Sequence, residues 1–267
     1  MPKGIVILRY SMKIDIERMK NIVLEAGKLL LDERAASDIS EKGVADFVTA
    51  VDLASQTYIR GELEKYFPEA AILSEEGNNV DFSPSEYTFV LDPVDGTTNL
   101  IHRYRQSAVS LGLVHNGVSV AGVVYNPFTN ELFWAESGQG AYCNGRRMSV
   151  SCECDFSRCV ITIGTMPYYK QYADKNFDMF RRIYLDAVDI RRTGSSALDI
   201  CYTADGRTDA FFERGLKAWD FAAGAVILSE AGGKLTDWEG KELDLYSEQN
   251  VLGSNSPIHD RMLTYLN

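Results

Sequence analysis

The chain has 267 residues, of which 45% are hydrophobic and 11% are aromatic, and it carries a formal net charge of -11. This length is enough for one large core or for two closely packed lobes. The negative charge argues against nucleic acid or an anionic membrane as a bulk partner, because clustered lysines and arginines bind such surfaces. An acidic protein can still bind a phosphate ester if its carboxylates hold a divalent cation.

Cysteine usage and the N-terminal segment bear on the cellular compartment. The cysteines are odd in number and lack the spacing of a disulfide framework; they are Cys143, Cys152, Cys154, Cys159 and Cys201. A chain with a sufficient core does not need such links, so we expect reduced thiols and a cytoplasmic protein. The apolar residues 5–8 are too few for a signal-peptide core or a membrane span, and no other run is long enough. We expect the first eleven residues to form a loose extension.

The first predicted element is an amphipathic helix over residues 14–31, where apolar side chains recur at helical spacing. A second helix is expected from about residue 53 to 67, with Pro68 as its stop. The first clear strand is expected only after these two helices, at 70–73. Three apolar, β-rich segments separated by turn residues occupy 107–135, which indicates an antiparallel meander.

Beyond residue 157 strands and helices alternate. The expected elements are a strand at 159–163, helices near 174–186 and at 195–203, a strand at 209–212, a helix at 217–231 and a last strand before Gly253. This pattern predicts mixed sheets sandwiched by helix pairs, in a single domain over residues 1–267. Its N-terminal half is expected at about 13–156 and its C-terminal half at about 157–267.

The most informative stretch begins with a buried strand at 88–91 and continues Asp-Pro-Val-Asp-Gly-Thr-Thr-Asn to residue 99. Asp92 emerges where a sheet ends, which is where α/β proteins place their sites. Pro93 restricts the backbone and Gly96 frees it, so that Asp92 and Asp95 can point together while the amides of Gly96 and Thr97 open a short helix. The alternative is a plain turn, since Pro-x-Asp-Gly is a common turn sequence.

Four further acidic positions lie at the ends of predicted elements, and each has a structural explanation. Asp52 heads the second helix, where an aspartate is a favourable N-cap. Glu75 and Glu76 follow the strand at 70–73, where they could be a solvated loop pair. Asp220 lies in the first turn of an apolar helix, where it complements the helix dipole.

Together with Asp92 and Asp95, these acids could be gathered by the folded sheet at one place. Two like charges about 4 Å apart repel by roughly 4 kcal/mol at an effective dielectric near 20, so the cluster needs cations. Magnesium takes oxygen ligands and keeps some of its waters, which leaves room for a phosphate and a nucleophilic water.

Four linked motifs resemble those of the inositol monophosphatase family: residues 42–52, 74–77, 92–99 and 219–224, in the same order and spacing. The resemblance extends from about residue 14 to 266. It implies an α+β fold, the layered αβαβα sandwich shared with fructose-1,6-bisphosphatases. It also implies a homodimer and a magnesium-dependent, lithium-sensitive hydrolysis of a phosphate monoester, with two to three Mg²⁺ ions per site.

The resemblance further implies a set of metal ligands. Glu75, Asp92 and the backbone carbonyl of Val94 would hold a first ion, and Asp92, Asp95 and Asp220 a second. A third, weaker ion would lie near Glu75. The second ion would stabilise the departing alkoxide.

The catalytic residues that the resemblance implies are Thr97, Asp52 and Glu75. Thr97, supported by Asp52, matches the pair that orients the attacking water and helps to deprotonate it. The amides of Gly96 and Thr97 would bind the phosphate.

The alcohol half of the substrate is expected to meet later residues of the chain. Gly194, Ser195 and Ser196 resemble the family segment that lines the sugar pocket, and Glu213 matches a glutamate that binds inositol hydroxyls. Asp95 and Asp220 would also contact the substrate. Ser196 stands where the family usually has alanine, and the Gly-Ser-Ser sequence is equally consistent with a plain helix cap.

The expected reaction is the hydrolysis of myo-inositol 1-phosphate to inositol and phosphate. Phosphatases of adenosine 3',5'-bisphosphate often carry a lysine where this chain has Thr98, which favours the inositol ester. Fructose-1,6-bisphosphate and histidinol phosphate remain alternatives, because specificity among small polyols depends on a few hydrogen bonds. The rival from another class is a non-catalytic, regulatory member of the same fold.

Overall fold

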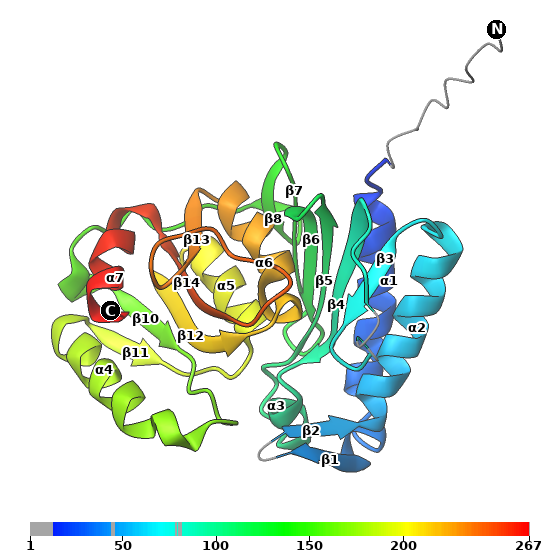
Figure 1. The fold of residues 1–267 in the computed structure, drawn as a ribbon, viewed down its shortest axis with the longest axis horizontal. Helices are drawn as coiled ribbons and strands as arrows, with labels where there is room; N and C mark the ends of the chain where they lie inside the picture. Colours follow the sequence, from blue (N-terminus) through cyan, green and yellow to red (C-terminus); the bar gives the residue numbers. More distant parts are fainter. Residues whose placement is uncertain (1–12, 44–45, 78, 80–81, 267) are drawn as a thin grey trace, which may run out of the picture.

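The computed structural model describes residues 13–43, 46–77, 79 and 82–266, so the expected N-terminal extension lies outside the described residues. Two mixed sheets lie side by side, with one helix pair between them and one on each outer side, so that the layers run from left to right in Figure 1. This is the layered αβαβα sandwich of an α+β fold, as predicted. No helix in the described ranges is both long and apolar enough to cross a membrane.

The outermost layer on one side consists of α1 (Ile16–Gly27) and α2 (Ala50–Tyr66). Both present apolar side chains to the sheet, and Met19, Val23 and Ile59 are fully buried. The prediction placed no strand between these helices and was wrong there, because the hairpin of β1 (Ile39–Gly43) and β2 (Asp46–Thr49) separates them. Every residue of β1 is exposed, so this strand lacks the alternation by which a half-buried strand is recognised.

The first large sheet has seven strands in sequential order. They are β3 (Ala71–Ser74), β4 (Tyr87–Asp95), β5 (Ala108–His115), β6 (Val118–Asn126), β7 (Glu131–Glu136), β8 (Gly140–Cys143) and β9 (Arg146–Arg147). The β3–β4 pair is parallel, whereas the following pairs are antiparallel. The predicted meander is confirmed as β5, β6 and β7.

The second sheet has five strands in the order β11-β10-β12-β14-β13. Their bounds are β10 (Val160–Ile163), β11 (Asp189–Arg191), β12 (Ala210–Leu216), β13 (Gly233–Asp237) and β14 (Gln249–Asn255). The helices of this half are α4 (Ala173–Asp186), α5 (Ser196–Ala204), α6 (Ala218–Glu230) and α7 (His259–Leu266). Of these elements, β11, β13 and α7 were not predicted; the two strands are short or only partly buried, and α7 spans about two turns.

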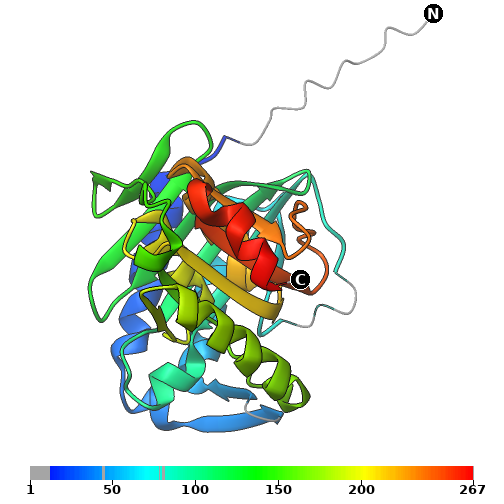
Figure 2. The same cartoon turned by 90° about the vertical axis from the view of Figure 1, so that its left-hand side faces the viewer.

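Helices α5 and α6 fill the space between the two sheets, and their side chains form one hydrophobic core with both. Helices α4 and α7 cover the outer face of the second sheet, and they lie in front of it in Figure 2. The buried side chains therefore form three hydrophobic cores. One lies between α1, α2 and the first sheet, one lies between the two sheets around α5 and α6, and one lies between the second sheet, α4 and α7.

Helix α6 approaches the first sheet unusually closely because two paired strands carry glycine beneath it. Gly112 of β5 lies opposite Gly122 of β6. A Cβ atom at Gly122 would lie 2.4 Å from the carbonyl oxygen of Ala223, and one at Gly112 would lie 3.0 Å from its backbone nitrogen. The backbone of α6 thus rests directly on the sheet, which fixes the position of the first turn of this helix.

Candidate metal-dependent active site

Strand β4 delivers the two aspartates of the predicted turn. It extends through Asp95, beyond the expected end at residue 91, and its pairing with β5 is irregular between Asp92 and Asp95. Gly96 then adopts a left-handed conformation (φ 88°) that favours glycine, and α3 (Thr97–Ile101) follows. The irregularity lets both carboxylates leave the strand towards the same side, as the sequence predicted.

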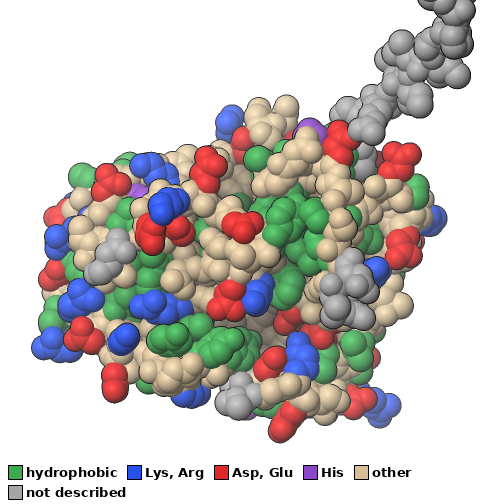
Figure 3. All heavy atoms as spheres, in the orientation of Figure 1, with side chains coloured by type: hydrophobic (Ala, Val, Ile, Leu, Met, Phe, Trp, Pro, Cys, Tyr) green, Lys and Arg blue, Asp and Glu red, His purple; other side chains and the backbone are tan. Residues whose placement is uncertain are grey.

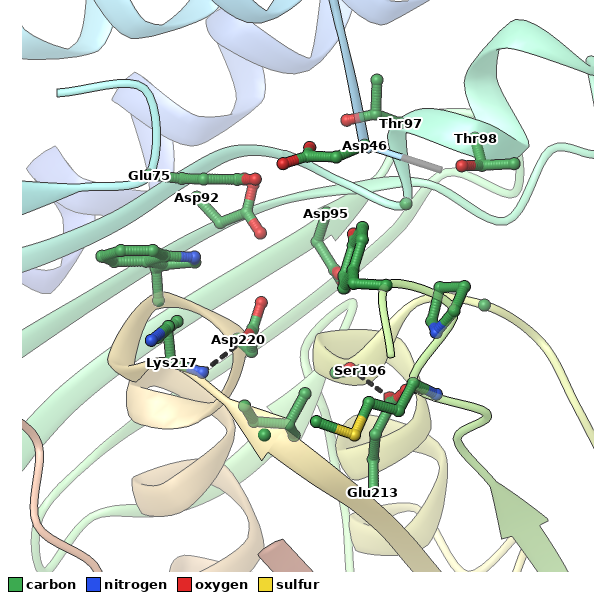
Figure 4. A pocket seen from close by; sticks show the side chains of 18 of the residues that line it. Asp46, Glu75, Asp92, Asp95, Thr97, Thr98, Ser196, Glu213, Lys217 and Asp220 are labelled. Carbon is green, nitrogen blue, oxygen red and sulfur yellow. Dashed lines mark hydrogen bonds between the residues drawn. The ribbon is translucent and has the colours of Figure 1, made fainter. Parts of the chain in front are cut away.

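Three of the expected ligands meet in space. Carboxylate oxygens of Asp92, Asp95 and Asp220 all lie within 4.8 Å of one another. Asp220 comes from the first turn of α6, where its carboxylate also accepts a hydrogen bond of 2.7 Å from the backbone nitrogen of Lys217. Figure 4 shows that Glu75, which directly follows β3, points at the same space from beside Asp92.

Burial raises the pKa values of all four acids. The pKa of Asp92 and that of Asp220 lie well above the usual range, because burial is reinforced by the neighbouring carboxylates. Burial raises the pKa of Asp95 to about 6 and that of Glu75 to about 7. A site that destabilises its own carboxylates in this way is one that a divalent cation would stabilise.

The donor set fits a hard divalent cation such as magnesium. It consists of carboxylate oxygens together with the backbone carbonyl of Val94, a residue of the same cavity whose carbonyl oxygen lies 3.1 Å from the Thr97 hydroxyl. Magnesium prefers oxygen ligands, and no cysteine or histidine lines the cavity among the described residues. The residues that could hold the metal are therefore Glu75, Asp92, Val94, Asp95 and Asp220.

Thr97 and Asp52 form a hydrogen-bonded pair beside the acids. The Thr97 hydroxyl donates to Asp52 Oδ1 over 2.8 Å, although these residues come from different layers. The expectation that Asp52 caps α2 was wrong: Thr49 is the N-cap, and Asp52 accepts hydrogen bonds from the backbone nitrogen and hydroxyl of Thr49 in a capping box. Asp52 is fully buried, and burial raises its pKa although the hydrogen bonds from Thr49 and Thr97 act to lower it.

Lys42 of β1 was not predicted as a site residue. Its ammonium lies 2.6 Å from Glu76, 3.4 Å from Glu75 and 3.5 Å from Asp46. Burial lowers the pKa of Lys42, but the three carboxylates outweigh burial and raise it. The lysine therefore compensates part of the negative charge on the Glu75 side, and only the hairpin that the prediction missed could have identified it.

Of the expected alcohol-binding residues in the later part of the chain, Gly194, Ser196 and Glu213 line the cavity, whereas Ser195 does not. Ser196 donates a hydrogen bond of 3.1 Å to Glu213 Oε2, and the other oxygen of Glu213 accepts from the backbone nitrogen of Met166. Ser195 is the N-cap of α5, and its hydroxyl donates a hydrogen bond to the Asp95 carboxylate. The helix-cap interpretation of the Gly-Ser-Ser sequence is confirmed for Ser195. Ser196 faces the cavity (Figure 4), and its contact with an alcohol stays a prediction.

One cavity of about 750 Å³ is lined by the acids Glu75, Asp92, Asp95 and Asp220 together with Lys42, Thr97, Ser196 and Glu213. Asp52 is not part of this lining and is connected to it through its hydrogen bond with Thr97. In Figure 3 acidic and basic side chains gather around a hollow near the centre of the face shown. The cavity is also lined by aromatic and cationic residues to which the prediction gave no site role: Phe47, Tyr168, Trp219, Arg192 and Lys217. Phe47 and Trp219 lie within two of the four family motifs, which could have pointed to them. Tyr168, Arg192 and Lys217 lie outside those motifs, so the folded chain was needed to find them.

The family model described as the inositol monophosphatase family matches residues 13–267. The Nus factor SuhB of Escherichia coli K12 is 42% identical over 228 residues, 85% of each chain, and the inositol-1-monophosphatase of Rhizobium meliloti is 39% identical over 239 residues, 88% of this chain and 90% of that one. The crystal structure of the extragenic suppressor protein suhB from Bartonella henselae superposes with a TM-score of 0.89 at 37% identity, covering 94% of this chain and 98% of that one. The chain therefore belongs to the inositol monophosphatase family.

Proposed function

We propose that this protein is a magnesium-dependent phosphatase that hydrolyses small phosphate monoesters, with myo-inositol 1-phosphate as its preferred substrate. The observation that carries the proposal is the convergence of Asp92, Asp95 and Asp220 within 4.8 Å beside the Thr97–Asp52 pair. A relative named inositol-1-monophosphatase supports the substrate.

The metal ions would be held by the acids described above. Glu75, Asp92 and the carbonyl of Val94 would bind one Mg²⁺ ion, Asp92, Asp95 and Asp220 a second, and Glu75 would also lie near a weaker third. When bound, the ions supply neutralisation of phosphate charge, acidification of a water and stabilisation of the leaving oxygen.

The protein's own groups would align the reactants. The Thr97 hydroxyl lies 2.8 Å from Asp52 Oδ1 and 3.1 Å from the Val94 carbonyl oxygen, and it has one hydrogen to donate. When it donates this hydrogen to Asp52, its oxygen can accept a hydrogen bond from the attacking water. The raised pKa of Asp52 makes this carboxylate a suitable acceptor for the proton that Thr97 passes on. The backbone amides of Gly96 and Thr97 would hold the phosphate, and Glu75 would help to place the water.

The alcohol half would bind at Glu213, Ser196 and the Gly194–Ser195 backbone, with Asp95 and Asp220 near the ester oxygen. Burial raises the pKa of Glu213. Each carboxylate oxygen has two lone pairs, so Glu213 can accept hydrogen bonds from polyol hydroxyls in addition to those from Ser196 and Met166. Specificity for a hydroxyl-rich ring would follow from this buried acceptor.

The proposal is tested by a phosphate-release panel in magnesium with inositol 1-phosphate, fructose-1,6-bisphosphate, adenosine 3',5'-bisphosphate and histidinol phosphate. We expect the largest kcat/KM with inositol 1-phosphate and inhibition by lithium. A larger value with another ester would reassign the substrate. The Glu213→Gln variant, which can keep one acceptor for Met166, should raise the KM for inositol 1-phosphate more than that for 4-nitrophenyl phosphate, and equal changes would refute the polyol contact.

A second candidate function is a non-catalytic, regulatory one, which the relatives named Nus factor SuhB favour. The same panel separates the two, because a regulatory protein without activity would release no phosphate from any ester. We further propose that the chain acts as a single phosphatase domain in the cytoplasm and as a homodimer, and sedimentation analysis of the purified protein tests the oligomeric state.

A further inference from the structure

Two segments from different halves of the chain meet at the candidate active site. Residues 95–99, here called the phosphate turn, carry the groups proposed to face the phosphate. Residues 191–196, here called the alcohol loop, lead into α5 and carry Ser196. The distance between these segments determines how far the reacting phosphorus lies from the groups that recognise the alcohol. A side chain that links the segments therefore bears on specificity.

Asn99 provides such a link, and it has no role in the function proposed above. Its side-chain nitrogen donates one hydrogen bond to the carbonyl of Gln106, over 2.6 Å, and a second to the carbonyl of Thr193, over 3.0 Å. Both hydrogens of the carboxamide are thereby used, and the residue is only 9% exposed. One side chain thus joins α3, the segment before β5 and the alcohol loop.

The backbones around Asn99 are in close contact. A Cβ atom at Gly96 would lie 3.2 Å from the carbonyl oxygen of Gly194, and one at Gly194 would lie 3.0 Å from the carboxamide of Asn99. Both glycines have left-handed φ angles. The alcohol loop is consequently pressed against the phosphate turn with the Asn99 carboxamide between them.

The alcohol loop is also held from its other side. The Thr193 hydroxyl donates to Asp199 over 2.6 Å, and Asp199 is almost completely buried in α5. The Thr193 residue is therefore bound through its carbonyl to Asn99 and through its side chain to α5. Removal of the Asn99 carboxamide would leave the α5 anchor and the Ser195–Asp95 hydrogen bond in place, but it would remove the link between the phosphate turn and the Thr193 carbonyl.

We infer that Asn99 is a positioning residue, whose two hydrogen bonds set the alcohol loop at the distance from the phosphate turn that a polyol phosphate requires. This inference rests on the function proposed above. It assigns Asn99 no contact with the substrate and no part in metal binding. A second link between the two segments, from Asp95 to the Ser195 hydroxyl and to the backbone nitrogen of Ala197, does not involve Asn99.

The reaction itself and the recognition of the alcohol should respond differently to the loss of Asn99. An ester whose alcohol does not use the alcohol loop, such as 4-nitrophenyl phosphate, needs only the acids and the phosphate turn. Inositol 1-phosphate needs both segments in register, and a misplacement of about 1 Å can cost on the order of 100-fold in rate.

The experiment compares Asn99→Ala with the wild-type protein on both esters in magnesium. We expect kcat/KM for inositol 1-phosphate to fall at least about 10-fold, mainly through KM, and that for 4-nitrophenyl phosphate to fall less than about 3-fold. The thermal shift produced by magnesium should stay unchanged. The matched control is Asn255→Ala, which also removes a buried carboxamide that donates to a backbone carbonyl, that of Glu153, but outside the cavity. It should leave the ratio of the two kcat/KM values as in the wild type.

A folded Asn99→Ala protein with a wild-type ratio, or with equal losses on both esters, overturns the inference while the proposed function stands. If this variant does not fold, Asn99→Ser, which keeps a single donor, is measured by the same ratio. A wild-type protein that hydrolyses neither ester overturns the proposed function and this inference together.

Discussion

Replacing Gly122 by alanine tests how the packing of α6 controls the candidate site. The added Cβ would lie 2.4 Å from the Ala223 carbonyl oxygen and 2.8 Å from its Cα, both of which belong to helix backbone. Helix backbone cannot rotate away as a flexible side chain can. The helix must therefore move away from the sheet by on the order of 1 Å, since carbon atoms in contact lie about 3.5–4.0 Å apart.

The expected cost follows from overpacking of a dense core. Overpacking a core typically lowers the free energy of unfolding by about 1–3 kcal/mol, and because the clash here is with helix backbone we expect about 3 kcal/mol for Gly122→Ala. For a chain of this size, about 1 kcal/mol lowers Tm by roughly 2–4 °C, so we expect a loss of roughly 6–12 °C. Because α6 carries Asp220 in its first turn, the thermal shift produced by magnesium should also shrink.

The assay is thermal unfolding with magnesium and with a chelator, followed by phosphate release. The matched control is Gly61→Ala in α2, where an added Cβ meets no atom within 4 Å. Alanine in this exposed helix position should raise stability by about 0.5–1 kcal/mol. A Gly122→Ala protein with the Tm of the wild type would refute the argument that the glycine pair sets the position of α6.

Two further outcomes are expected. Asp95→Asn should abolish phosphate release and the magnesium-dependent thermal shift, and near wild-type turnover would contradict the ligand role. The metal-free variant should be at least as stable as the metal-free wild type, because like charges within 4.8 Å of one another repel by about 3 kcal/mol at a dielectric near 20. Burial lowers the pKa of His259 in the folded protein, so the imidazole binds a proton more readily in the unfolded chain. The stability that the neutral His259 contributes to the folded protein is therefore lost as pH falls through about 6.5. The excess in Tm of the wild type over His259→Gln should therefore shrink from pH 7.5 to 5.5, and a constant difference would rule out this linkage.

The sequence was sufficient for elements whose hydrophobic pattern is regular. The helices observed as Ala173–Asp186 and Ala218–Glu230 differ from their predicted bounds by only one residue at each altered end. The strand followed by Asp-Pro-Val-Asp-Gly also gave a correct local geometry, because short-range sterics at proline and glycine determine a turn. By the same logic, the fully exposed β1 could not be recognised, and Lys42 was missed with it.

The linear sequence determined that acids stand at the ends of strands and helices, and the tertiary structure decided which of them meet. Periodicity reports which face of an element is buried but not which element covers it. Asp220 reaches Asp92 and Asp95 only because glycines let α6 lie against β5 and β6. The pairing of Thr97 with Asp52 likewise depends on α2 packing beside β4. These contacts arise from the docking of distant segments, which no local pattern encodes.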